Sequence, residues 1–159
     1  MLTRTVRLFP GLIAATSLLL LADCTNNSPL NPLTDTAGTY QLTLFRGVTP
    51  PVTDTYTAGQ INSLPNGGTV TWTDGTMVLN SNGTFIETNN YTVTPTGGPS
   101  TPGAFVSSGT YTVRGTAFTL NAPIQNTVPA RNATGTISAS TIDYQESNGT
   151  GFDSYQFKR

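Results

Sequence analysis

From Gly38 onward, apolar and polar residues alternate in short segments that are separated by clusters of Gly, Asn, Pro and Ser. A repeat of two residues is typical of strands with one buried face, and no stretch of a dozen residues shows helical periodicity. The sequence therefore predicts an all-β fold. A meander of eight or nine short strands removes its free edges most simply by pairing the first strand with the last. We expect a small up-and-down antiparallel β-barrel over residues 38–159.

The segment Ser107–Asn121 carries the clearest hairpin pattern. A two-residue turn at Arg114-Gly115 would set Tyr111 opposite Phe118, and the apolar residues of both flanks would then share one face. A slip of one residue would mix apolar and polar side chains, because neighbouring residues of a strand point to opposite faces. The pattern therefore predicts an antiparallel pair with its apolar face inward.

A second hairpin is predicted around Asn80–Gly83. A three-residue loop with Gly83 at positive φ would pair Leu79 with Phe85, whereas a two-residue Asn-Gly turn would pair Leu79 with Ile86. The hairpin is predicted in either case, and both registers stay open.

A third hairpin is predicted over Ala133–Glu146, where a turn at Ala139-Ser140 would set Ile137 opposite Ile142. Ala-Ser is a poor pair for positive φ, so a longer loop is an alternative.

Further strands complete the meander. They are predicted at Gly38–Arg46, Thr55–Ile61, Thr69–Trp72 and Phe152–Lys158. The segments Pro50-Pro51 and Thr94–Gly103 are expected to be loops, because proline has no N–H to donate to a central ladder.

The inward positions of these strands form an apolar and aromatic set. Its members are Tyr40, Leu42, Leu44, Leu79, Phe85, Tyr111, Phe118, Leu120, Ile137, Ile142, Tyr144 and Phe157. An eight-stranded barrel can hold one small ligand, so this set is a candidate ligand lining. The alternative is that the same side chains fill the barrel as a solid core.

The N-terminus has the pattern of an export signal over residues 1–23. Arg4 and Arg7 precede an almost unbroken apolar run, Gly11–Ala22, which is shorter than the roughly 20 residues that a membrane-spanning helix needs. The run ends in Leu-Ala-Asp-Cys, a lipobox-like tetrapeptide that makes Cys24 the predicted lipidation site. Its acyl chains would hold the protein on a membrane.

One position departs from the lipobox. Asp23 stands where the signal peptidase prefers a small uncharged side chain. The alternative to lipidation is therefore ordinary secretion after cleavage near Ala22, which would leave the protein secreted or periplasmic with Cys24 as a free thiol. In either case residues 24–37, rich in Pro, Asn and Thr without periodicity, are expected to form a flexible tether.

The composition of the chain limits the functions that we expect. The chain has Lys+Arg 7, Asp+Glu 8, a formal net charge of -1, one cysteine and no histidine. No basic stripe exists to neutralise phosphates, so nucleic-acid binding is not expected. The commonest general base and metal ligand is missing, so we expect neither an enzyme nor a metal or other cofactor.

Carboxylates are the only conventional catalytic groups that remain. Asp143 and Glu146 are three residues apart, so a strand would place them on opposite faces, with Asp143 toward solvent. Asp153 could point inward, but a role at the entry of the last strand is the simpler interpretation. A glycosidase needs two carboxyl groups across a cleft, and this pattern does not provide them.

Several short motifs, in their order along the chain, resemble one family. They are Gly38-Thr39-Tyr40, the run from Leu79 to Phe85, Gly109-Thr110-Tyr111-Thr112-Val113 with Gly115 and Phe118, and the terminal Tyr155-Gln156-Phe157-Lys158-Arg159. In these the chain resembles the short bacterial lipocalin-like lipoproteins. The resemblance implies an up-and-down barrel outside the cytoplasm and, for most members, no assigned activity. Tyr40 stands where the eukaryotic lipocalin signature has tryptophan, and no segment suits the usual C-terminal helix.

These observations lead to an expected function. We expect an extracytoplasmic protein of the bacterial cell envelope, lipid-anchored at Cys24, whose barrel binds a small hydrophobic ligand. The alternative is a non-enzymatic structural or interaction protein with a solid core, which contacts an envelope partner through its loops. A carboxylate-based hydrolase is the third and least supported hypothesis.

Overall fold

The computed structural model describes residues 35–125, 129–149 and 151–159, so Cys24 and the predicted signal segment 1–23 lie outside the described residues. Nine strands are found in these ranges. They are β1 (Gly38–Phe45), β2 (Val52–Tyr56), β3 (Gly68–Leu79), β4 (Thr84–Pro95), β5 (Thr101–Arg114), β6 (Ala117–Ala122), β7 (Arg131–Ile137), β8 (Thr141–Ser147) and β9 (Phe152–Lys158). In the same ranges, no helix has the length and apolar character needed to cross a bilayer.

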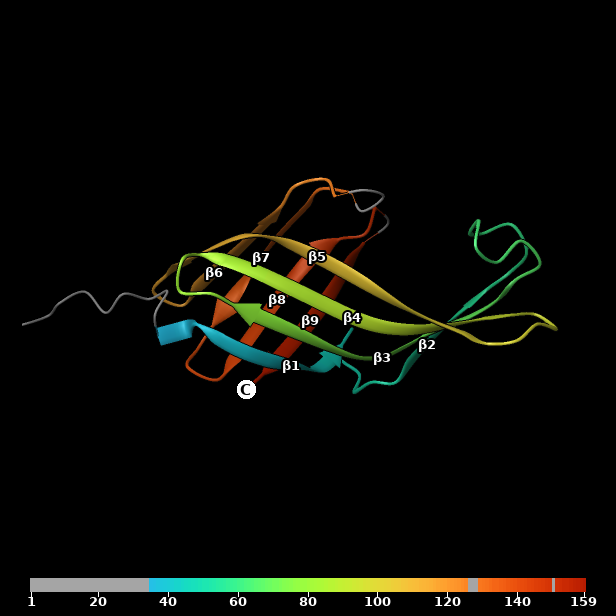
Figure 1. The fold of residues 1–159 in the computed structure, drawn as a ribbon, viewed down its shortest axis with the longest axis horizontal. Coiled ribbons are helices and arrows are strands. Elements are labelled where there is room, and N and C mark those ends of the chain that lie inside the picture. Colours follow the sequence, from blue (N-terminus) through green and yellow to red (C-terminus); the bar gives the residue numbers. More distant parts are fainter. Residues whose placement is uncertain (1–34, 126–128, 150) are drawn as a thin grey trace, which may run out of the picture.

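The strands form one antiparallel meander that closes on itself. The order is β1-β9-β8-β7-β6-β5-β4-β3-β2, and β1 also pairs with β3. The pairing of β1 with both β9 and β3 closes a barrel of eight strands, and β2 is an extra strand beside β3 (Figure 1). The predicted all-β barrel, closed by the first and last strands, is therefore confirmed.

Three strands are longer than the barrel needs. β3 and β4 have 12 residues each and β5 has 14, but β6 pairs only with Thr110–Arg114 of β5, and β1 only with Thr76–Leu79 of β3. The remaining parts of β3, β4 and β5, together with β2, project from the barrel as an arm, seen at the right of Figure 1.

The arm corrects the expectation that 94–103 is a loop. Pro102 lies within β5 and pairs with Thr92 of β4. The backbone N–H of Tyr111 donates to the carbonyl of Gly83, on the β4 side of β5. Backbone N–H groups alternate in direction along a strand, so the nitrogen of Pro102, nine positions earlier, points to the opposite side. Pro102 therefore faces the edge of β5, where no described strand needs a donor, and this is a position that proline tolerates.

The strands predicted at Thr55–Ile61 and Thr69–Trp72 have other bounds in the structure. β3 runs well beyond Thr69–Trp72. A bulge between Trp72 and Asp74 interrupts the alternation of apolar and polar residues, so the sequence pattern does not show that the strand continues. β2 ends at Tyr56, and residues 57–67 form a loop in which the side chain of Leu64 is 0% exposed. The predicted strand Thr55–Ile61 is therefore wrong beyond Tyr56, because the residues up to Ile61 belong to this loop.

The hairpin registers test the turn predictions. Leu79 pairs with Phe85 and Gly83 has φ 82°, so the three-residue loop is confirmed over the Asn-Gly turn. Ile137 pairs with Ile142, as predicted for the two-residue turn at Ala139-Ser140.

The β5–β6 register was predicted wrongly by two residues. Tyr111 pairs with Leu120 and not with Phe118, so the turn lies at Gly115-Thr116. Gly115 has φ 60°, whereas Thr116 is not among the residues with positive φ, which places glycine at the first turn position. This is the type II′ arrangement, while the prediction assumed glycine at the second position. A shift of two keeps the same side chains inward, so the apolar face was predicted correctly.

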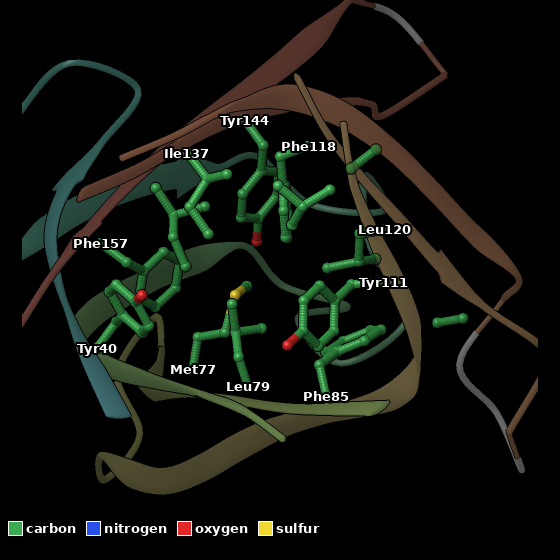
Figure 2. Packing of buried hydrophobic residues seen from close by; sticks show 14 residues of the cluster. Tyr40, Met77, Leu79, Phe85, Tyr111, Phe118, Leu120, Ile137, Tyr144 and Phe157 are labelled. Carbon is green, nitrogen blue, oxygen red and sulfur yellow. The ribbon is translucent and has the colours of Figure 1, made fainter. Parts of the chain in front are cut away.

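The barrel core is a continuous cluster of apolar side chains (Figure 2). All members of the predicted inward set are buried except Leu42, which is partly buried against the cluster, and Leu44. A bulge in β1 between Leu42 and Leu44 adds one residue and reverses the alternation, so Phe45 points inward at 2% exposure. Leu44 lies opposite Gln156 and borders a hollow on the outer face of the barrel, so its inward assignment was wrong.

Candidate functional site

The barrel has two different ends. At one end lie the turns of the β3–β4, β5–β6 and β7–β8 hairpins and the two ends of the described chain. Arg159 donates hydrogen bonds there to the carbonyls of Asp35, Ala37 and Ala139, at 3.0, 2.9 and 2.6 Å. The arm projects from the opposite end (Figure 1). We call this opposite end the mouth.

A charged network lies in the barrel wall near the mouth. Arg131 of β7 donates through Nη1 to Oε2 of Glu87 on β4 at 3.1 Å, and through Nε to Oε2 of Glu146 on β8 at 2.7 Å. Glu87 is 0% exposed and Arg131 8%. Charges are seldom buried to this degree unless they are paired and hydrogen-bonded, so the network holds three strands at fixed positions.

Neutral donors complete the network. Tyr144 Oη and Asn89 Nδ2 donate to Oε1 of Glu87 at 2.8 and 2.6 Å, and Tyr155 Oη donates to Oε1 of Glu146 at 3.2 Å. Burial and the nearby Glu87 carboxylate raise the pKa of Tyr144 well above its usual value. Burial and Glu146 likewise raise the pKa of Tyr155. Both phenols therefore stay protonated at neutral pH and act as donors.

The guanidinium of Arg131 is shared between two carboxylates. Burial alone would lower its pKa, but the negative charges of Glu87 and Glu146 outweigh burial and raise it. The network of Glu87, Glu146 and Arg131 thus carries one more negative than positive charge.

Sequence reasoning missed Glu87 and Arg131 as interior residues, although the signal was present. Glu87 comes two residues after inward Phe85, and Arg131 two residues before inward Ala133. Side chains two apart share one face of a strand, so the alternation used for the apolar set already placed both inside. They were overlooked because charged side chains are not expected in a core.

A hollow of about 530 Å³ opens beside this network. Phe105, Pro129, Ala130, Arg131, Glu146 and Asn148 are among its lining residues. The guanidinium of Arg131 lies 5.1 Å from the centroid of the Phe105 ring, which gives the hollow one aromatic and two charged walls.

Aromatic rings continue from the network toward the arm. The ring of Phe45 lies 5.1 Å from Tyr155 and 5.5 Å from Trp72, and Trp72 lies 5.3 Å from Tyr91. These centroid distances are typical of favourable aromatic pairs. Gly103 lies under Tyr91, where an added Cβ would meet the ring at 2.6 Å.

Several buried polar atoms at this end have no hydrogen-bond partner among the described residues. They include Oδ1 of Asn89, Oγ of Ser107 and Nε1 of Trp72. Ser107 is the cross-strand partner of Glu87, and its side chain is 1% exposed on the same inner face. Unsatisfied buried groups are uncommon in native proteins, so this end of the interior stands out from the rest of the barrel.

The predicted ligand-lining residues lie mainly elsewhere. Tyr40, Leu120, Ile142 and Phe157 are each 0% exposed, so no space large enough for a water molecule borders them. In Figure 2 the side chains of Tyr40, Leu120 and Phe157 point from the barrel wall into one shared interior. The hollow at the mouth is instead lined by residues outside the predicted set.

The remaining carboxylates have separate roles. Asp143 is exposed on the outer face of β8 and accepts from Gln156 Nε2 at 2.8 Å, while Glu146 faces inward, as the spacing of three residues predicted. Asp153 forms an ion pair with Arg46 at 2.6 Å, and Arg46 pairs also with Asp54 at 2.7 Å. In the described ranges, no group of three or more His, Cys, Asp or Glu side chains could hold a metal ion.

The fold and this site define an antiparallel β-barrel with a charged mouth. The chain matches no protein-family model, no curated protein and no solved structure. The resemblance to short bacterial lipocalin-like lipoproteins therefore stays a prediction from the motifs.

Proposed function

We propose that this protein is an exported barrel, lipid-anchored at Cys24 in the bacterial cell envelope, that binds a small, largely hydrophobic ligand at its mouth. The observation that carries the proposal is the hollow of about 530 Å³ between Phe105 and the charged network. Its volume falls within the roughly 300–1,000 Å³ of small-molecule pockets. It combines the apolar residues Phe105, Pro129 and Ala130 with a larger number of polar and charged residues.

The proposal places the ligand at the mouth and not in the centre of the barrel. Tyr40, Leu120, Ile142 and Phe157 are completely buried, so in this proposal the centre of the barrel is a packed core that supports the site. A rigid support of this kind favours binding, because the site loses little conformational freedom when a ligand enters.

The position of the first described residues is compatible with the anchoring part of the proposal. Asp35 and Ala37 lie at the end opposite the mouth, where their carbonyls accept hydrogen bonds from Arg159. A tether that joins the barrel at this end leaves the mouth open to ligands. Mass spectrometry of the mature N-terminus tests the anchor, and an unmodified Cys24 would contradict it while leaving the binding site to be tested separately.

Filling the hollow tests the binding part. Ala130 is an exposed residue of the hollow, and Ala130→Trp would occupy its space. We expect thermal shift assays with a panel of small hydrophobic compounds to show ligands that raise the melting temperature of the wild type but not of Ala130→Trp. Ala117→Trp, at an exposed position of β6 away from the hollow, is the matched control and should keep the shift. A panel without any stabilising ligand would contradict the proposed function.

A second candidate is an interaction role. Ile86 and Val106 are each 48% exposed on the outer face of β4 and β5, where Val106 pairs with Thr88 and Ile86 pairs with Ser108. Neighbouring exposed apolar side chains of this kind suit contact with an envelope partner. A thermal shift panel in which no compound binds the hollow would favour this interaction role over ligand binding.

A further inference from the structure

The excess of negative charge at the mouth bears on which ligand the hollow accepts. We propose that the hollow selects amphipathic organic cations, such as alkylammonium compounds, over neutral and anionic molecules of the same size. This inference rests on the proposed function, because it names the chemical class of the ligand for the same hollow.

Arg131 is a poor site for an anion, because all three of its guanidinium nitrogens already contact carboxylates. Each of its guanidinium nitrogens already lies within bonding distance of an acceptor: Nε on Glu146, Nη1 on Glu87 and Nη2 on Glu146. A ligand carboxylate would have to displace one of these carboxylates and would meet the other at close range. The guanidinium is also packed over Phe105, which leaves its face covered.

The carboxylates, in contrast, are not fully compensated. Glu87 and Glu146 share one guanidinium, and their other donors are the neutral phenols of Tyr144 and Tyr155 and the amide of Asn89. Glu146 has a side chain 15% exposed and borders the hollow, so a cation can approach it without entering the packed core. A ligand cation there would bring the network to electrical neutrality.

The same imbalance recurs beside the hollow. Arg46 is shared by Asp54 and Asp153, and Asp153 also accepts from Asn148 Nδ2 at 3.1 Å. Asn148 lines the hollow, so this second group of charges adjoins its rim. Two arginines thus face four carboxylates at the mouth, and the field in the hollow favours positive charge.

The chemistry of the carboxylate wall points to the same class of ligand. Glu146 borders the hollow, and its carboxylate only accepts hydrogen bonds. An ammonium group carries several N–H donors and no acceptor, so it matches this wall.

Three ligands that share one octyl chain test the inference. Isothermal titration calorimetry at pH 7 compares octylammonium, 1-octanol and octanoate on the wild-type protein. We expect octylammonium to bind about tenfold more tightly than 1-octanol, because a unit charge close to a partly exposed carboxylate that shares its guanidinium with a second carboxylate contributes about this much. Octanoate should bind most weakly, and added salt should weaken the binding of octylammonium most.

A charge-removing variant locates the effect. Glu146→Gln removes one negative charge from the wall of the hollow and should lower the affinity for octylammonium about tenfold without lowering that for 1-octanol. Asp143→Asn removes the same charge from the outer face of the same strand, β8, and should change neither affinity. This pair separates a local carboxylate from the net charge of the protein.

The possible failures are distinguishable. Octanoate binding as tightly as octylammonium, or a preference for octylammonium that survives Glu146→Gln, would overturn the inference while the proposed binding function stands. Binding of none of the three octyl compounds would contradict the proposed function itself, and the inference with it.

Discussion

At the scale of single residues, the most informative feature is a buried arginine between two glutamates. Arg131 joins Glu87 and Glu146 from three different strands. Pairing offsets much of the cost of removing these charges from water, but it does so only while every partner is present. The network therefore fixes the positions of β4, β7 and β8 relative to one another. Removing one of its charges should lower the stability of the protein.

Removing the central cation should destabilise the protein strongly. We expect Arg131→Met to lower the free energy of unfolding by about 3–5 kcal/mol, because Glu87 would remain buried without its ion-pair partner. Chemical denaturation followed by circular dichroism measures this change. Arg114→Met, at an exposed position before the β5–β6 turn, is the control and should have an effect within about 0.5 kcal/mol.

A double variant checks the cause. Adding Glu87→Gln to Arg131→Met replaces the orphaned charge by a neutral amide and should recover part of the lost stability. A double variant that is less stable than Arg131→Met alone would contradict this explanation.

At the scale of elements, a glycine in β7 lets the backbone of β8 approach closely. Gly135 of β7 lies opposite both Phe118 of β6 and Tyr144 of β8. A Cβ on Gly135 would run into the backbone carbonyl of Asp143 and the Cα of Tyr144. The close approach of β8 at this position therefore requires a residue without a side chain.

A methyl group at this position should disturb the sheet. Gly135→Ala should cost about 1–3 kcal/mol of stability, because backbone atoms of β8 have to move. Gly151→Ala is the matched control: its added Cβ would meet only Asn148 Oδ1, at 3.9 Å, and its φ is not positive. Urea denaturation of the two variants gives the comparison, and equal stabilities would refute the packing argument.

At the scale of the whole molecule, closure creates two unlike ends. The pairing of β1 with β9 and β3 produces one packed interior, and the long strands β3, β4 and β5 continue past it as the arm. The packed end is tied by Arg159 to the start of the described chain, and the mouth holds the charged network and the hollow. The packed end and the proposed binding site therefore lie at opposite ends of the barrel.

Closure also buries phenols, which predicts sensitivity to alkali. The pKa values of Tyr40, Tyr111, Tyr144 and Tyr155 are raised, with burial as the first cause in each. Above about pH 10 the unfolded chain loses these protons more readily than the folded protein, so the stability present at lower pH is lost as pH rises.

Denaturant titrations at several pH values measure this loss. The free energy of unfolding should fall above about pH 10 by up to about 1.4 kcal/mol per pH unit for each such tyrosine. Tyr144→Phe should show a shallower fall, because it lacks one of these phenols. A constant stability between about pH 9 and pH 11 would show that the phenols ionise freely in the folded protein.

The sequence by itself determined the strand class, most of the inward faces and the β7–β8 register, and it narrowed the β3–β4 hairpin to two registers. These depend on neighbours in the chain: Gly83 sets the loop that pairs Leu79 with Phe85, and alternation sets which side chains share a face. Even the shifted β5–β6 register kept Tyr111, Phe118 and Leu120 inside, because a shift of two residues preserves the faces.

Only the tertiary structure decided the rest. The β1 bulge that turns Leu44 outward is set by the pairing of β1 with β9. The length of β3 is set by its pairing with β4, and no local pattern within β3 indicates it. The network of Glu87, Arg131 and Glu146 brings together residues up to 59 positions apart, from Glu87 to Glu146 (146 − 87 = 59). Alternation shows that each of them points inward, but only the closed sheet, with its fixed register around the barrel, decides that they meet.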